Sequence, residues 1–419
     1  MRVIIVGGGI AGLSQALTLL QIGVECRVYE AAARLEPAGF GINLQPNAVR
    51  ELSALGLGDR LADAGILTAE LAFYNKHGQL IWSEPRGTKA GYRWPQISIS
   101  RGKLHEILIT AVNERLGPGG IVTGHRLTDF KDDRVKVVAR FADPQGRPAG
   151  EAEGDILIGA DGIHSAVRKH FYPGEKAVYD KFLHYRGTIA GEPFLTGRTM
   201  AIVGHRKLRV VLYPIARFPD GRVTINWLAY APIPPGSPPL EAWDVAADAS
   251  LAAAPYQGWT FPWVDVHGLL ARTETVMQLP NVDRDPVPRW SFGRVSLIGD
   301  AAHPMQPIGA QAGSQAVVDG RVLGASLLAV KNPAEALIHY QDQRIAAMNA
   351  MVIRNRNFGP ESVMQLAEER APQGFAAITD VLSKEELEGT AEGFKKAAGF
   401  DLETVNSRDS YVEFTQKMS

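Results

Sequence analysis

The chain of 419 residues is 45% hydrophobic and 21% charged, which provides enough apolar side chains for a large core and suggests two interleaved domains. Its formal net charge of -1 and the lack of any block of like charges give no pull toward nucleic acid or anionic membranes. A single cysteine, Cys26, excludes an intrachain disulfide and a cysteine-cluster metal site. Without an apolar run of about 18 residues or a leader pattern before the first strand, we expect a soluble, cytoplasmic protein with small-molecule partners and no metal.

The start of the chain carries a dinucleotide-binding pattern. An apolar strand runs directly into Gly7-x-Gly9-x-x-Gly12, and Glu30 follows a second apolar strand over 26–29. Gly7 permits a tight turn, Gly9 lets the backbone approach a pyrophosphate, and Gly12 lets the following helix pack close to the strand. Glu30 is placed to accept hydrogen bonds from ribose hydroxyls. The order of strand, glycines, helix, strand and acid predicts a nucleotide cofactor.

The next segments leave the nucleotide-binding sheet and return to it. A loop around Gly41 can bring bare backbone against a flat ligand, and it precedes a predicted helix over about 46–55. Alternating apolar residues over 71–82, with a turn at 76–78, predict a hairpin.

Two later helix starts carry polar groups. A helix begins at Ser100 and Arg101, and Arg101 could either hold a phosphate or simply face solvent. A buried strand over 154–159 ends in an Asp161-Gly162 turn, and a helix begins near Ser165. An Asp-Gly turn alone is common and usually structural, so the position alone assigns no function to Asp161.

The middle of the chain predicts an antiparallel sheet, because its apolar residues recur with a period of two. The predicted strands are 182–190, 208–215 and 222–230. The proline-rich run 231–239 is expected to leave the sheet as a stiff connector, and 243–270 is expected to form helix and loop.

A second buried strand over 294–299 ends at Asp300, before a small-residue helix over about 313–331. An aspartate at the carboxyl end of such a strand, next to a helix start, lies where open α/β sheets bind ligands. After Asn357 the sequence is charged and amphipathic, which predicts surface helices compatible with either a monomer or a homodimer.

Three of these motifs together resemble one family. The clamp at Gly7 to Gly12, the segment Gly159-Ala-Asp-Gly-Ile-His-Ser-Ala-Val-Arg168, and Gly299-Asp-Ala-Ala-His303 with Pro307 are similar to the signatures of the FAD-dependent aromatic hydroxylases, the class A flavoprotein monooxygenases. The resemblance covers about residues 1–355. Within the family, the segments 41–46, 82–87, 282–286 and 309–315 look most like the bacterial phenazine hydroxylases that act on 5-methylphenazine-1-carboxylate.

The resemblance implies an α/β fold with a Rossmann-like FAD-binding domain of the glutathione-reductase type, as in para-hydroxybenzoate hydroxylase, and an interleaved antiparallel-sheet substrate domain. We expect the discontinuous FAD-binding domain to comprise 1–70, 99–178 and 280–355, the substrate domain 71–98 and 179–279, and a helical C-terminal tail 356–419.

The resemblance also implies which residues hold FAD and how NAD(P)H is used. The expected cofactor-binding residues are Gly7, Gly9, Ala11, Gly12, Glu30, Gly41, Arg101, Asp161, Asp300, Gly309 and Gly313. Because a second glycine clamp is not found in the sequence, NAD(P)H would bind transiently, and the Asp161 segment would serve both cofactors. Ala312 and Ser314 depart from a glycine and an asparagine in many relatives, which is interpreted as a subgroup trait.

The expected chemistry requires a buried flavin, since the C4a-hydroperoxide formed with O2 survives only where water is excluded. The antiparallel sheet would cover a small aromatic substrate. Alternation places His184, Arg186 and Thr188 on one side of a strand, and Tyr213 and Asn226 lie on neighbouring strands. Arg186 or Arg209 could pair with a substrate carboxylate, and a ring hydroxyl could bond Tyr213 or the Pro307 carbonyl. A structural role in the sheet is the simpler alternative for each, and His303 is expected to be structural.

We therefore expect an FAD-dependent monooxygenase that uses NAD(P)H and O2 to hydroxylate an N-heteroaromatic, phenazine-like or phenolic carboxylate, with or without loss of the carboxylate. Three alternatives are a Baeyer–Villiger or ring-opening oxygenation on the same scaffold, a non-catalytic flavin-binding ligand sensor, and an NAD-dependent dehydrogenase. The dehydrogenase fits less well because it gives the Asp300 segment no role.

Overall fold

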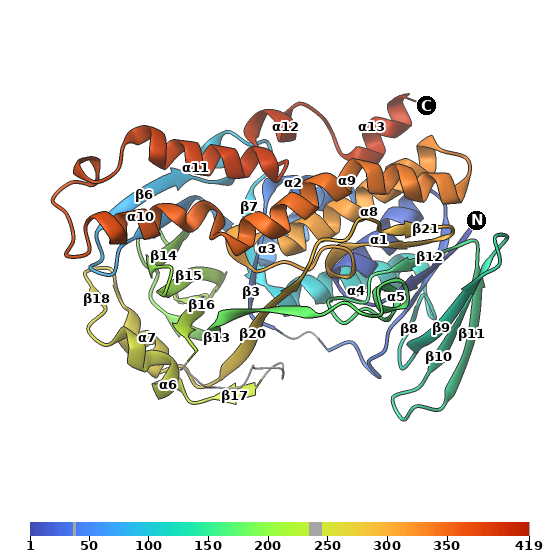
Figure 1. Cartoon of the computed structure of the whole chain (residues 1–419), viewed down its shortest axis with the longest axis horizontal. Helices are drawn as coiled ribbons and strands as arrows, with labels where there is room; N and C mark the ends of the chain where they lie inside the picture. Colours follow the sequence, from blue (N-terminus) through green and yellow to red (C-terminus); the bar gives the residue numbers. More distant parts are fainter. Residues whose placement is uncertain (37–38, 234–244, 419) are drawn as a thin grey trace.

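The protein is described here from a computed structural model that covers residues 1–36, 39–233 and 245–418 (Figure 1). Two large sheets meet at the centre of the molecule, and long helices from the second half of the chain lie across both (Figure 1). Residues 234–239 of the predicted proline-rich connector, together with Trp243, lie outside the described residues.

The first large sheet is the nucleotide-binding half of the fold. Its strands occur in the order β21 (Ser291–Phe292), β22 (Val295–Leu297), β12 (Ile156–Gly159), β1 (Arg2–Val6), β2 (Glu25–Tyr29) and β8 (Ile121–Val122). All neighbours are parallel except β21 and β22. Strands β1 and β12 are almost wholly apolar because a parallel sheet is covered on both faces.

Helices that follow the strands pack around this sheet. Helix α1 (Ile10–Gln21) contacts both α4 (Arg101–Leu116) and α8 (Ala312–Ala329), and α8 contacts α9 (Pro333–Arg356). Ser100 caps α4 by accepting from the Lys103 N–H, and Ser165 caps the short helix α5 (Ala166–Phe171) in the same way. The helices predicted to start at Ser100 and near Ser165 are therefore confirmed.

The second large sheet has eight strands, and the three strands predicted from alternation are among them. Its order is β17 (Val245–Ala247), β20 (Val276–Arg284), β13 (Ala177–Gly191), β16 (Val223–Pro232), β15 (Leu208–Arg217), β14 (Thr199–His205), β5 (Glu70–Tyr74) and β6 (Leu80–Pro85). Only the β14–β5 pair is parallel among the described strands of this sheet. The predicted hairpin over 71–82 forms its edge.

Small elements connect the two large sheets. The three-stranded sheet β3 (Gly41–Leu44), β7 (Gln96–Ser100) and β4 (Ile66–Thr68) contacts β15 on one side and α8 on the other. Helix α2 (Pro46–Ala54) follows β3, as predicted. The described part of 243–270 contains the expected short helices, α6 (Ala249–Ala253) and α7 (Val266–Ala271), together with the short strands β18 (Thr260–Phe261) and β19 (Val264–Asp265).

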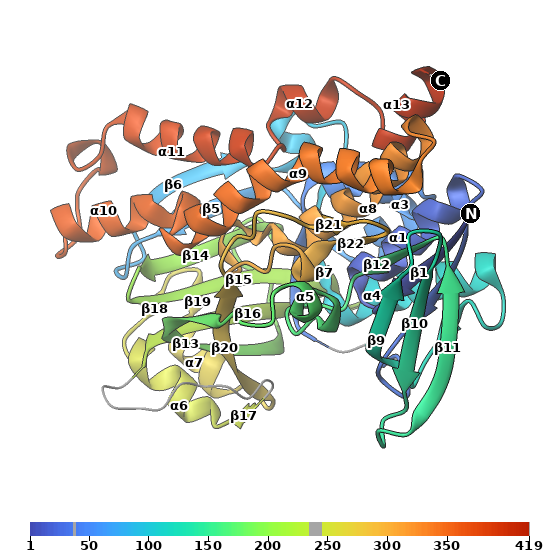
Figure 2. The same ribbon diagram turned by 45° about the vertical axis from the view of Figure 1, so that its right-hand side comes forward.

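A separate three-stranded sheet of β9 (Arg126–Asp132), β10 (Val137–Ala142) and β11 (Pro148–Gly154) lies at the edge of the molecule, far from the eight-stranded sheet (Figure 2). Its strands mix buried and exposed residues, as expected for a sheet with one face in solvent.

The C-terminal tail is helical, as predicted. It contains α10 (Ser362–Arg370), α11 (Lys384–Ala397), α12 (Leu402–Asn406) and α13 (Tyr411–Met418). Helix α10 lies against β14 and β6, where its apolar residues share a buried cluster with the face of the eight-stranded sheet that carries Tyr213 and Leu228 (Figure 2). The tail therefore belongs to the core of the molecule and is not an appendage.

The predicted fold class is confirmed: the chain is an α/β protein with a parallel nucleotide-binding sheet, an interleaved and mainly antiparallel second sheet, and a helical C-terminal region. The exact domain boundaries stay a prediction. In the part of the chain that the structure describes, every helix is too short or too polar to cross a membrane.

Candidate active site

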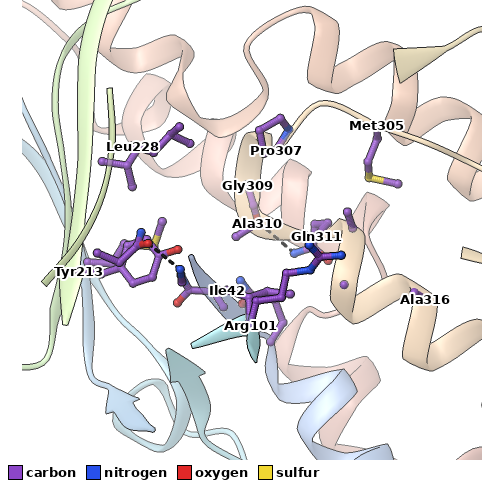
Figure 3. Close-up of a pocket in the computed structure, with 18 of the residues that line it drawn as sticks. Ile42, Arg101, Tyr213, Leu228, Met305, Pro307, Gly309, Ala310, Gln311 and Ala316 are labelled. Atoms are coloured by element: carbon purple, nitrogen blue, oxygen red, sulfur yellow. Dashed lines mark hydrogen bonds between the residues drawn. The ribbon is translucent and has the colours of Figure 1, made fainter. Parts of the chain in front are cut away.

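One large cavity, with a volume of about 430 Å³, lies where the two large sheets meet. The nucleotide-binding half, the β3 strand and the eight-stranded sheet all contribute to its wall. Figure 3 shows Tyr213 and Leu228 on the sheet side, across from Gln311 and Ala316 near the start of α8. Most residues predicted from sequence line this cavity: Gly9, Ala11, Gly41, Arg101, Asp300, Gly309, Gly313, Arg186, Tyr213, Asn226 and Pro307.

The first glycine turn brings bare backbone to the cavity wall. Gly7 has a φ of +108°, and a Cβ there would overlap the carbonyl oxygen of Ala160. A Cβ on Gly12 would overlap the Gly7 carbonyl oxygen, so this glycine permits α1 to pack against the strand end. Gly9 faces open space and lines the cavity. Gly7 and Gly12 shape the turn, and Gly9 faces the space a ligand would fill.

Two helix N-termini open on this cavity without a side-chain cap. Gly9 precedes α1 and Gln311 precedes α8, and neither provides a capping hydrogen bond. Residues from both helix starts line the cavity. The first N–H groups of a helix lack partners within the helix and attract anionic or electron-rich groups. The Ser caps of α4 and α5 show that this chain caps helices elsewhere.

Three predicted acids occupy different positions around the clamp. Glu30 accepts from the Gly8 and Ala32 N–H groups, both at 2.7 Å, and thereby fixes the glycine turn. Asp161 accepts from the Ser165 hydroxyl at 2.5 Å and the Ala166 N–H at 2.7 Å. Neither lines the cavity as the structure describes it.

Asp300 does line the cavity, at the carboxyl end of the β22 segment. Its position deep in the protein raises the pKa of the carboxyl group, while the charges of His303 and Arg101 act in the opposite direction. Arg101 lies at the start of α4 and lines the same cavity. Asp300 and Arg101 thus bring a carboxyl group and a guanidinium cation to the side of the cavity formed by the nucleotide-binding half.

The opposite wall comes from the eight-stranded sheet. The Asn226 side-chain oxygen accepts from the Gly41 N–H at 2.6 Å, which ties β16 to β3. Tyr213 pairs with Asn226 in the register of β15 and β16, and burial raises the pKa of its phenol to about 12. Tyr213 therefore stays protonated near neutral pH and can donate a hydrogen bond.

The two candidate arginines differ. Arg186 lines the cavity, and its buried Nε has no hydrogen-bond partner among the described residues. Arg209 is fully enclosed, with Nε 3.0 Å from Glu361 and its guanidinium 3.5 Å from the Tyr230 ring centroid. The geometry therefore favours Arg186 over Arg209 as the group that meets a ligand. Thr188 is exposed and does not reach the described cavity.

His303 has the structural position expected for it. Its Nε2 lies 2.5 Å from an Asp319 oxygen, and both side chains are fully buried. Asp319 also accepts from the Gly299 N–H at 2.9 Å and from Arg344 Nε at 2.8 Å. This network holds the turn that carries Asp300.

Ala312 and Ser314, which depart from the residues of many relatives, lie in the first turn of α8. The Ser314 hydroxyl accepts from the Gln45 N–H at 3.0 Å, and Ala312 lines the cavity. A Cβ on Gly313 would lie 2.6 Å from Cδ1 of Ile42. Ser314 thus joins the helix start to the β3 loop in this chain.

Several residues of the cavity wall were not predicted as site residues from the sequence. These are Asn43, Gln45, Arg86, Gln96, Met200, Ile202, Glu361, Phe394 and Phe400. The alternation in the segment 96–100 could have indicated the inward side of β7. The last three belong to the C-terminal region, which carries no motif, and only tertiary packing brings them to the cavity.

Comparison with known proteins identifies the family. The family model described as an FAD binding domain matches residues 1–183 and 265–355. The chain belongs to this family. Among its curated relatives, the phenazine 1,6-dicarboxylic acid hydroxylase PhzS of Lysobacter antibioticus is 37% identical over 388 residues, which are 91% of this chain and 95% of the relative.

Other relatives are aromatic monooxygenases of the same type. The 3-amino-4-hydroxybenzoate 2-monooxygenase PtmB3 of Streptomyces platensis is 33% identical, covering 86% of this chain and 88% of the relative. The solved structure of Klebsiella pneumoniae HpxO with FAD and uric acid matches with a TM-score of 0.74 and 26% identity, covering 97% of this chain and 96% of that one. This chain is an FAD-dependent aromatic monooxygenase, as its motifs predicted.

Proposed function

We propose that this enzyme uses NAD(P)H and O2 to hydroxylate a phenazine-like N-heteroaromatic or a phenolic carboxylate. The main support is that one cavity joins the glycine turn and two uncapped helix starts to a sheet face with Arg186 and Tyr213. The similarity to a phenazine dicarboxylic acid hydroxylase over 91% of the chain favours the phenazine class.

The residues fit FAD, because the unpartnered N–H groups of α1 and α8 and the open backbone at Gly9 offer donors to its pyrophosphate and ring. Gly7, Gly9, Ala11, Gly12, Gly41, Arg101, Asp300, Gly309 and Gly313 would hold it, with Glu30 near the adenosine ribose and Asp161 serving both flavin and nicotinamide. When bound, FAD supplies the redox chemistry that activates O2 with electrons from NAD(P)H.

The eight-stranded sheet would bind and orient the substrate. Leu228, Ile202 and Phe73 line the cavity and can pack against an aromatic ring. Arg186 would pair with a ring carboxylate, while the protonated Tyr213 hydroxyl would donate to a ring oxygen or nitrogen. The Pro307 carbonyl can accept a hydrogen bond from a ring hydroxyl.

The C-terminal tail would keep water from the reacting atoms. Phe394 and Phe400, from the C-terminal tail, line the cavity and are 4% and 2% exposed. Their burial gives the cavity an apolar boundary on the tail side, which excludes water and so limits side reactions.

The test is NADH and NADPH consumption by the FAD-loaded protein with phenazine carboxylates, quinolines and hydroxybenzoates, with products identified by mass. We expect a phenazine carboxylate to stimulate consumption and to yield a product that gains one oxygen or exchanges its carboxylate for a hydroxyl. The proposal fails if no member of the panel stimulates consumption in protein that holds FAD. Stimulation with only peroxide released would contradict hydroxylation of that ligand.

The homodimer and the cytoplasmic location stay predictions. Size-exclusion chromatography with light scattering measures the mass of the FAD-loaded particle and decides between monomer and dimer. Small aromatic substrates are expected in either case.

A further inference from the structure

A buried charge cluster lies between the end of β6 and helix α11. Glu84 Oε1 is 2.7 Å from an Arg86 terminal nitrogen, and Glu84 Oε2 is 2.6 Å from Nζ of Lys395. The side chains of Arg86, Glu84 and Lys395 are only 10%, 8% and 17% exposed. Two cations therefore share one carboxylate in a region with little water.

The three ion-paired side chains carry a net positive charge. Burial alone would raise the pKa of Glu84, but the Arg86 and Lys395 charges lower it below its ordinary value, so Glu84 is ionised. Among the described residues, Glu84 is the one carboxylate within 4.0 Å of the Arg86 guanidinium. The three ion-paired groups sum to +1, and Arg86 and Glu84 act on Tyr92 together with Asp401 and Glu392. Arg86 is the cation of this group that lines the cavity, so an anionic ligand there would meet a buried guanidinium.

Arg86 directs this charge toward the cavity. It lines the cavity wall, it is 9% exposed, and its buried Nε has no hydrogen-bond partner among the described residues. The two acids that line the same cavity have other basic neighbours: Glu361 lies 3.0 Å from Arg209, and Asp300 is influenced by Arg101. Arg86 therefore faces the cavity with a guanidinium whose Nε lacks a protein partner in the described part of the chain and whose one ion pair there is with Glu84.

Arg86 and Arg186 approach the cavity from well-separated strands of the sheet. Arg186 lies on β13, and Arg86 follows β6, five positions away in the strand order. Five inter-strand spacings correspond to about 24 Å between backbones, and the two long side chains shorten the gap between their charged ends. Two arginines separated in this way match acidic groups at opposite ends of a planar molecule.

We propose that Arg86 forms a second anion subsite, so that the substrate is a planar aromatic with two acidic groups, one on Arg186 and one on Arg86. This inference rests on the proposed function. It adds a role for the tail, because Lys395 of α11 supplies half of the positive charge that makes the subsite cationic.

The experiment measures binding without turnover. FAD-loaded protein is titrated, without NAD(P)H, with phenazine-1,6-dicarboxylate, phenazine-1-carboxylate and phenazine, and Kd is obtained by calorimetry and from the flavin absorbance. We expect wild type to bind the dicarboxylate about tenfold or more tightly than the monocarboxylate, since a charge-assisted hydrogen bond supports such a ratio. Arg86→Gln should bring the ratio of the two Kd values close to one.

Two further variants should change the preference for the dicarboxylate in opposite directions, which a loss of folding would not do. Glu84→Gln raises the cluster charge to +2 and should increase the preference for the dicarboxylate, whereas a merely structural Glu84 would weaken binding of both ligands. Lys395→Met lowers the charge to zero and should reduce the preference. Arg140→Gln, an exposed position on β10, is the matched control. Thermal unfolding and the FAD content of each purified variant show whether it is folded and loaded with FAD.

The outcomes separate the two proposals. If wild type binds no phenazine carboxylate, the proposed function fails and the subsite with it. If it binds the monocarboxylate but the dicarboxylate no more tightly, the second subsite alone is wrong. If Arg86→Gln weakens FAD binding and leaves the ligand ratio unchanged, Arg86 belongs to the flavin site and the inference is overturned.

Discussion

At the scale of single residues, Asp319 shows how a buried charge supports the site from behind. Burial alone would raise its pKa, but His303, Arg344 and the Gly299 N–H lower the pKa below its ordinary value of 3.8. Because the Gly299 turn carries Asp300, the pairing of Asp319 fixes the position of a cavity-lining acid. His303 supports the same turn indirectly, through its contact with Asp319.

The Asp319 network makes a prediction for pH-dependent stability. Asp319→Asn leaves Arg344 without its carboxylate and should lower the free energy of unfolding by about 3–5 kcal/mol. A lowered folded pKa stabilises the protein above the unfolded value and loses this contribution as pH falls through the folded value. The difference between wild type and variant, from urea unfolding, should be constant above about pH 5 and shrink below it. A difference that grows on acidification would contradict this role.

Tyr213 provides a second prediction at this scale. Since burial raises the pKa of its phenol to about 12, the hydroxyl donates throughout the neutral and mildly alkaline range. Tyr213→Phe should lower kcat/KM by about three- to tenfold, the value of one neutral hydrogen bond. The loss should be the same at pH 7 and pH 9, because the hydroxyl is protonated at both. A loss that disappears at pH 9 would show that a titrating phenolate contributes instead.

At the scale of secondary-structure elements, the site depends on how closely β3 approaches the eight-stranded sheet. A Cβ on Gly41 would lie 2.7 Å from Cγ of Asn226 and 2.8 Å from Cε2 of Tyr213. Gly41→Ala should therefore destabilise the protein by about 1–3 kcal/mol through overpacking and should weaken FAD binding. Gly174→Ala is the matched control, since a Cβ there meets nothing within 4 Å. Equal melting temperatures for the two variants would show that the contact is not tight.

Helix α11 forms the tail side of the cavity. The Phe394 ring packs against Gly309, where a Cβ would overlap the ring, and it lines the cavity. Phe394→Ala should lower the free energy of unfolding by about 3–5 kcal/mol and leave a cavity beside Gly309. We expect more peroxide and less product per NAD(P)H consumed, relative to wild type and to the exposed-site control Phe218→Ala. If Phe394→Ala forms as much product per NAD(P)H consumed as wild type, the tail does not contribute to water exclusion.

Partial alternation in the sequence predicted β13, β15 and β16, although β15 and β16 are buried on both faces over most of their length. Strands β14 and β20 were missed. Strand β14 is almost continuously buried and lacks alternation, and β20 contains Pro280, which argues against an interior strand. The structure accommodates Pro280 next to a register irregularity in the pairing of β13 with β20.

At the scale of the whole molecule, the cofactor half of the cavity could be predicted because local motifs shape it. The glycine turn, the Asp300 strand end and the start of α8 are each short segments with a mechanical reason for their residues. The substrate half could be predicted only as candidates, since Arg186 and Arg209 look equivalent in sequence. Burial against Glu361, a residue 152 positions from Arg209 in the chain, distinguishes them.

The tail shows the limit of local patterns most clearly. Glu361, Phe394 and Phe400 line the cavity, and Lys395 completes a charge cluster with Glu84, which lies 311 positions earlier. None of the four C-terminal positions lies in a motif. Their roles arise when the C-terminal helices pack over the edge of the eight-stranded sheet, so they become visible only in the folded chain (Figure 2).

We expect the enzyme to transfer one oxygen atom from O2 to an aromatic ring bound in the cavity between the two sheets. The most direct test is turnover of the FAD-loaded enzyme with NAD(P)H and a phenazine carboxylate under ¹⁸O2, with the product analysed by mass spectrometry. The product should carry one ¹⁸O atom in its new hydroxyl, while turnover under unlabelled O2 in H2¹⁸O should leave that hydroxyl unlabelled. A product hydroxyl that takes its label from water would contradict a monooxygenase reaction.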